Sequence, residues 1–111
     1  MDWQIQDYHK VLPVGKQVRL RYTDLTEDVE AHLMEGWVAV RSYNSDEEAW
    51  IPVVMTRRQA EESWFVAVIE PYEGVPNITG IKRSGSCLEI QLHNGQRDVV
   101  RWNDKGEISR D

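Results

Sequence analysis

Apolar and polar residues alternate over short stretches along most of this 111-residue chain. In residues 16–23, Val18, Leu20 and Tyr22 are separated by polar side chains. Successive side chains of a strand point to opposite faces, so this period of two is typical of a strand with one buried face and one solvated face. The segment therefore predicts an amphipathic strand.

Three further strands are predicted in the middle of the chain. Alternation over residues 37–43 and the apolar run over residues 50–56 both indicate extended segments. Pro52 lies within the second of these and lacks an amide hydrogen, so it requires a sheet edge or a bulge. Residues 64–69 are continuously apolar, which predicts either a central strand covered on both faces or a strand shared by two packed layers.

The last third of the chain contains four short extended segments separated by glycine-containing turns. They span residues 78–83, 87–93, 97–102 and 107–110. The Asn94-Gly95 pair tolerates positive φ and predicts a tight type I′ hairpin turn. About eight to nine short strands at this spacing predict an all-β fold, an antiparallel β-sandwich.

Residues 26–35 fit two structures. Acidic residues near the start and Gly36 at the end suit a capped helix. Val29, Ala31 and Leu33 also alternate with polar side chains, as in a strand. We favour the strand, because the neighbouring segments are all strands.

Composition narrows the class of protein. A mass of 13.0 kDa with 41% apolar residues predicts one domain, residues 1–111, with its own core. Thirteen basic residues against nineteen acidic ones give a net charge of −6, which disfavours nucleic acid or an anionic membrane as partner. The first residues lack the basic and apolar regions of an export signal.

Residues that could support catalysis or metal binding are scattered. The spacing of His9, His32 and His93 does not suit a metal site, so we expect exposed histidines and no metal. The single Cys87 cannot form an intrachain disulfide. Asp46-Glu47-Glu48 offers oxygen ligands to calcium without the spacing of a dedicated loop. No phosphate-binding or nucleophile motif is present, so we predict no cofactor and no catalytic residue.

Five tryptophans suggest a carbohydrate platform, since an exposed indole can stack on the apolar face of a sugar. We expect Trp37, Trp50 and Trp64 to lie in the core. Trp3 and Trp102 are the better candidates for exposure, although packing is favoured for Trp102. Arginines on polar strand faces could hold acidic groups of a glycan. The candidate carbohydrate-binding residues are Trp3, Trp102, Arg19, Arg21 and Arg101, with Arg97 nearby in sequence.

The order of several segments resembles the C-terminal β-sandwich of heparinase II/III-like polysaccharide lyases. The resemblance covers residues 19–72 and is carried by Arg19-Leu20-Arg21-Tyr22-Thr23, Glu35-Gly36-Trp37-Val38, Ser42-Tyr43, Ile51-Pro52-Val53-Val54 and Phe65-Val66-Ala67-Val68-Ile69-Glu70-Pro71-Tyr72. Two features depart from the family. The helical toroid with its catalytic side chains is not in this chain, and Asn44-Ser45-Asp46-Glu47-Glu48 follows the Ser-Tyr pair where a glycine-containing continuation is usual.

The resemblance implies a C-terminal fragment of a larger lyase that cleaves glycans containing uronic acid. Such a fragment would be a non-catalytic accessory domain, its partners being the rest of the lyase and an acidic polysaccharide. It would also be periplasmic or secreted. Two alternatives stay open: a free-standing carbohydrate-binding module, and a structural or protein-interaction β-sandwich.

Overall fold

The computed structural model describes residues 1–5, 11–39 and 48–111. These residues form nine strands, all paired in antiparallel fashion, which confirms the predicted all-β, β-sandwich-like fold. The described residues include no helix of the length and apolar character needed to cross a membrane. The strands are β1 (Asp2–Gln4), β2 (Arg19–Asp24), β3 (Glu30–Ala39), β4 (Glu48–Arg57), β5 (Ala67–Tyr72), β6 (Ile78–Ser84), β7 (Cys87–Leu92), β8 (Arg97–Trp102) and β9 (Ile108–Arg110).

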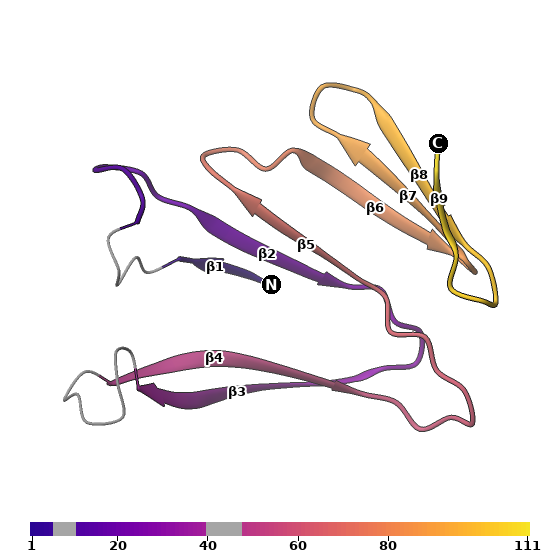
Figure 1. Cartoon of the computed structure of the whole chain (residues 1–111), viewed down its shortest axis with the longest axis horizontal. Helices are drawn as coiled ribbons and strands as arrows, with labels where there is room; N and C mark the ends of the chain where they lie inside the picture. Colours follow the sequence, from indigo (N-terminus) through magenta and orange to yellow (C-terminus); the bar gives the residue numbers. More distant parts are fainter. Residues whose placement is uncertain (6–10, 40–47) are drawn as a thin grey trace.

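The strands form three sheets. The three-stranded sheet has the order β1-β2-β5, the ribbon consists of β3 and β4, and the meander has the order β6-β7-β8-β9. Figure 1 shows the ribbon at the bottom, the three-stranded sheet in the middle and the meander at the upper right, with β5 beside β6. Two connections, residues 25–29 and 58–66, carry the chain into and out of the ribbon.

The meander confirms the prediction made from its glycine-containing turns, but one turn type differs. Gly95 has φ 84°, whereas Asn94 does not have a positive φ. The Gly95 amide donates to the Leu92 carbonyl at 3.0 Å, and the Leu92 amide donates to Gln96 at 2.9 Å. The type I′ prediction is therefore wrong. The connection is a three-residue loop in which only the last residue is left-handed, and the same pattern recurs at Gly106.

Of the two structures considered for residues 26–35, the structure shows the strand. A turn with Asp28 at φ 50° precedes Glu30, where β3 begins and continues for ten residues. Residues 30–39 thus form one strand that includes the start of the segment predicted over 37–43. Residues 40–43 lie outside the described residues, as do His9 and the first two acids of the proposed calcium loop.

Among the described residues, the segment 64–69 forms neither of the two predicted structures, a central covered strand or a strand shared by two packed layers. β5 begins only at Ala67 and pairs with β2 at one end of the three-stranded sheet. The side chains of Trp64, Phe65 and Ile69 are exposed. The apolar run shows that the segment is hydrophobic but does not indicate whether it is buried. No second layer of the described chain covers it.

Apolar side chains are poorly buried throughout the described residues. Leu88, 5% exposed, is their one buried hydrophobic residue, and fifteen large apolar side chains are exposed. The radius of gyration is 17.3 Å, against about 13 Å for a compact chain of this length. The accessible surface is 8845 Å², about 2,500 Å² more than a compact 13.0 kDa monomer would have. Within the described residues, the strands therefore do not enclose the core that the composition predicts.

The tryptophans reverse the predicted order of exposure. Trp37 and Trp50 are 57% and 66% exposed, and Trp64 is also exposed. Trp3 and Trp102 are half-buried, in agreement with the packing that we expected for Trp102. The reason is geometric: Trp37 and Trp50 are cross-strand neighbours on the ribbon, a sheet of only two strands that no other strand of the described chain joins.

Candidate functional site

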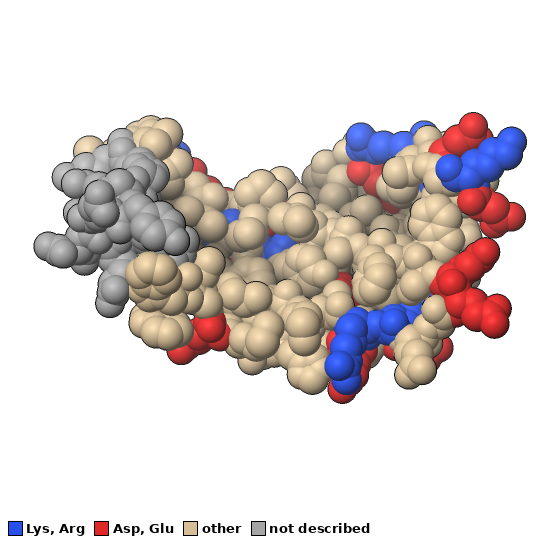
Figure 2. Space-filling view, turned by 60° about the horizontal axis from the view of Figure 1, so that its bottom comes forward, with Lys and Arg blue, Asp and Glu red and all other residues tan. Residues whose placement is uncertain are grey.

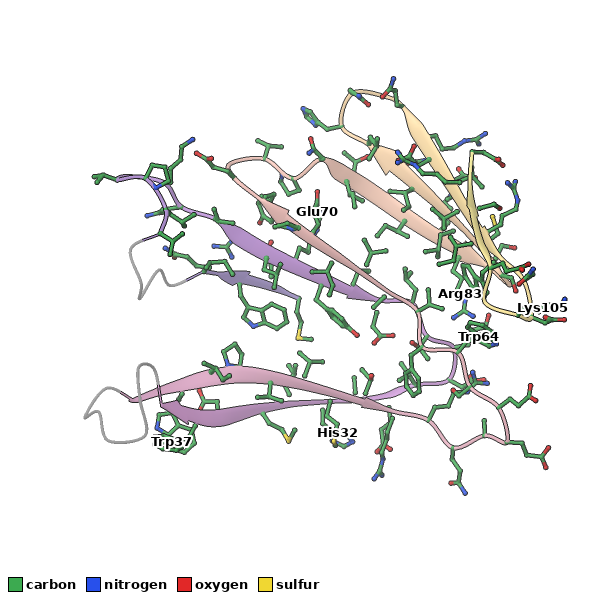
Figure 3. The ribbon with its side chains drawn as sticks, viewed as in Figure 1. His32, Trp37, Trp64, Glu70, Arg83 and Lys105 are labelled. Atoms are coloured by element: carbon green, nitrogen blue, oxygen red, sulfur yellow. The ribbon has the colours of Figure 1, made fainter. Side chains whose placement is uncertain are left out.

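A partly buried ion pair joins the three-stranded sheet to the meander. The Arg21 Nη2 atom lies 2.5 Å from Glu70 Oε2 and also donates to the Ile78 carbonyl at 2.5 Å. The Ile78 amide donates to Glu70 Oε1 at 2.9 Å. Glu70 is only 8% exposed and lies between β5 and β6 in Figure 3. One carboxylate therefore satisfies a guanidinium and the first backbone amide of the next sheet.

A second polar cluster lies further along the same face of the three-stranded sheet. The Arg19 Nε atom donates to Asp2 at 2.9 Å and to the Tyr72 hydroxyl at 3.2 Å. The Tyr72 hydroxyl donates to the other Asp2 oxygen. This hydrogen bond, reinforced by Arg19, lowers the pKa of Asp2, and the same bond raises the pKa of Tyr72. β1 is thereby tied across β2 to β5.

Arg83 connects the meander to the entrance of the ribbon. Its Nη1 atom donates to the Leu25 carbonyl at 2.6 Å, and its Nε atom donates to Gly85 at 2.9 Å. The guanidinium also stacks over Trp102, 5.5 Å from the ring centroid. Figure 3 shows Trp64 beside Arg83, near the turn that carries Lys105. Gly106 in that turn has φ 79°, a backbone conformation that favours glycine, and it lies next to the Trp64 ring.

The junction between the three-stranded sheet and the ribbon is also polar. The Tyr22 hydroxyl donates to Asp24 at 2.7 Å, and this hydrogen bond raises the pKa of Tyr22. The Asp24 carboxylate also accepts the Thr26 amide at 2.8 Å. Burial alone would raise the pKa of Asp24, but these hydrogen bonds outweigh it, and the pKa lies below its ordinary value. The buried Thr26 hydroxyl accepts the Val66 amide at 3.0 Å, which holds the two ribbon connections together.

An open apolar hollow lies where β1 and β2 approach β4. Its volume is about 650 Å³, within the range of small-molecule sites. Two tryptophans, Trp3 and Trp50, contribute to its wall together with Leu20, Ile51 and Pro52. The hollow thus brings together one predicted carbohydrate-binding residue and one tryptophan that the sequence pattern assigned to the core.

The five predicted carbohydrate-binding residues lie in different places. Trp3 pairs with Leu20, so it lies on the opposite face of the sheet from Arg19 and Arg21. Both arginines are engaged with acidic side chains of the chain itself. Arg101 and Trp102 lie on β8 of the meander, and Arg101 is paired with Asp111. Only Trp3 contributes to the apolar hollow.

The histidines within the described residues are far apart in the fold. His93 is exposed, as predicted, in the turn that follows β7. His32 differs from the prediction because it is half-buried on β3, with Nε2 3.4 Å from Glu30 Oε1 and no hydrogen bond to that nitrogen. In the part of the chain that the structure describes, no group of three or more His, Cys, Asp or Glu side chains is placed to hold a metal ion.

Sequence patterns did not single out Glu70 and Arg83, two residues that connect the meander to the rest of the described chain. Glu70 stood out only as part of the Glu-Pro-Tyr segment in the lyase resemblance. The partner atoms of both residues include backbone carbonyls or amides, of Ile78 and of Leu25, and such partners leave no signal in a sequence. Comparison of this chain with protein-family models, curated proteins and solved structures found no match.

Replacing Glu70 should destabilise the fold more than replacing an exposed acid nearby. We expect Glu70→Gln to lower the free energy of unfolding by about 2–3 kcal/mol, because Arg21 keeps its charge and loses its ionic partner. Glu73→Gln removes an exposed ion pair with Lys16 and should cost about 0–1 kcal/mol. Urea unfolding followed by tryptophan fluorescence measures both. Equal losses would contradict the role assigned to Glu70.

The lowered pKa of Asp24 makes the sheet–ribbon junction sensitive to acid. Because the folded-state pKa is below the unfolded value of about 4, the ionised carboxylate stabilises the fold above that pH. Its contribution disappears as the pH falls through the folded-state pKa. Asp24→Asn should therefore cost about 0.5–1 kcal/mol at pH 7 and progressively less below pH 4. Asp104→Asn, in an exposed turn, is the matched control in urea unfolding at several pH values. A cost for Asp24→Asn that is independent of pH would refute this account.

Proposed function

We propose that this chain is a non-catalytic accessory domain of a heparinase II/III-like polysaccharide lyase that acts on glycans containing uronic acid. In this role it packs against other domains of the same protein. The observation that carries the proposal is the uncovered apolar surface, since the described residues bury one hydrophobic residue and expose fifteen large apolar ones. Exposed apolar side chains are normal when scattered, but those that gather on one surface mark interaction sites.

The distribution of charge supports a packing role. Figure 2 shows charged side chains gathered mainly at one end of the molecule, with a broad expanse of uncharged residues across the middle. Six of the exposed apolar side chains belong to the ribbon: Leu33, Met34, Trp37, Trp50, Ile51 and Met55. A two-stranded ribbon is marginally stable in water by itself, so a covering layer would stabilise it.

The segments that carry the lyase resemblance are also neighbours in space. Leu20 of β2 lies opposite Pro71 of β5. Arg21 lies opposite Glu70 in the same pair of strands, and their side chains form an ion pair. The charged residues Arg21 and Glu70 of these two segments therefore stabilise the fold. This arrangement favours an accessory domain in which the residues that resemble the lyase family stabilise the fold. A periplasmic or secreted location is part of the same proposal.

The proposal predicts different behaviour for the isolated chain and for the longer polypeptide encoded by the reading frame that contains it. We expect the isolated chain to bind the apolar dye ANS strongly, because its apolar side chains lack a cover. It should release no unsaturated uronate, measured by absorbance. The longer polypeptide should bind much less dye per domain and cleave uronic-acid glycans. Glycan cleavage by the 111 residues alone, or a reading frame that encodes nothing further, would overturn the proposal.

The apolar hollow favours a second candidate function, a carbohydrate-binding module. Trp3 and Trp50 both contribute to its wall, and indole rings in an open hollow can stack on sugar faces. The polar side chain of Gln4 also lines the hollow and could hydrogen-bond a sugar hydroxyl. This site differs from the one predicted from sequence, because Trp50 takes the place of Trp102.

Calorimetric titration with neutral and acidic oligosaccharides tests the second candidate. Trp50→Ala should weaken binding at least tenfold by removing a stacking surface, whereas Trp102→Ala should leave affinity unchanged because Trp102 lies on the meander, outside the hollow. Circular dichroism establishes that both variants keep the fold. Absence of heat with every glycan would eliminate this function.

A further inference from the structure

The ribbon has two long outer edges, and one of them lacks the usual protection against pairing. β3 and β4 pair with each other over ten residues without a register shift, and no third strand of the described chain joins them. Natural edge strands are commonly short, bulged, or interrupted by proline or lysine. The short edge strands β1 and β9 follow this rule with three residues each.

The two edges of the ribbon are not equivalent. β4 contains Pro52, and a proline within a sheet normally turns its missing amide away from the paired strand. The outer edge of β4 therefore lacks a donor at Pro52. β3 contains neither proline nor lysine, and Leu33 near its middle is 72% exposed. The outer edge of β3 is thus the one suited to accept another strand.

We propose that β3 pairs with β3 of a second copy of this chain, in antiparallel orientation across a two-fold axis. The result is a continuous four-stranded sheet in which the two copies of β3 are central and the two copies of β4 are at the edges. Such an interface is self-complementary, as a two-fold requires. The proposal is independent of the lyase role, because it concerns a strand edge and not the faces that other domains would cover.

The positions of the charged residues and of Leu33 both favour a second copy as the occupant. With the axis beside Leu33, Glu30 lies opposite Gly36 and Glu35 lies opposite Ala31, so no two carboxylates oppose each other. Glu30 is already paired with Arg57 at 2.8 Å. At the axis, Leu33 of each copy lies opposite Leu33 of the other, so pairing covers an apolar side chain that is 72% exposed in the single chain.

Analytical ultracentrifugation of the isolated chain tests the proposal. We expect twice the monomer mass of 13.0 kDa at micromolar concentration. Leu33→Lys should weaken association at least tenfold, because it places two positive charges beside each other at the axis. Ile108→Lys is the matched control, since Ile108 is 74% exposed on the short edge strand β9, and it should leave association unchanged.

Hydrogen exchange on the unmodified chain provides a test that does not depend on a variant folding. The β3 amides should be protected at high concentration and should exchange faster on dilution, whereas meander amides should not respond. A monomer at all concentrations, or a dimer that Leu33→Lys leaves intact, would overturn the proposal. Protection of β3 that arises only in the longer polypeptide would also overturn the dimer proposal. That outcome would not contradict the accessory-domain proposal.

Discussion

The contact on which the described architecture most depends is the ion pair between Arg21 and Glu70. It connects β2 with β5 and, through the Ile78 backbone, connects both with the first strand of the meander. A carboxylate as buried as Glu70 is tolerated only when its oxygens are satisfied, and here each oxygen accepts a hydrogen bond. The geometry of three strands therefore depends on one acidic side chain.

Polar contacts determine how the three sheets are arranged, whereas hydrophobic burial contributes little within the described chain. Arg83 reaches the Leu25 carbonyl, and Tyr22 and Asp24 hold the entrance of the ribbon. Ion pairs in a protein interior are weak sources of net stability, because desolvation offsets much of their attraction. Most of the stability of a domain comes from apolar burial, so covering the exposed apolar surface, as the accessory-domain proposal requires, would stabilise this fold.

The two proposed roles use different parts of the ribbon. Other domains of a lyase would cover its apolar faces, whereas a second copy would pair with the backbone edge of β3. Faces and edges are geometrically independent in a sheet, because side chains point out of its plane and hydrogen-bonding groups lie within it. A domain could therefore be covered by its own polypeptide and still form a dimer.

Local patterns determined which segments are strands. Alternation identified β2, turn glycines identified the meander, and both depend on residues within a few positions of each other. The tertiary structure decided which of Trp50 and Trp102 is exposed, which strand lies at an edge, and that Glu70 meets Arg21 across 49 positions. Strand periodicity is a property of the backbone itself. Burial and ion pairing require a partner from another part of the chain, and an alternating pattern contains no information about where that partner lies.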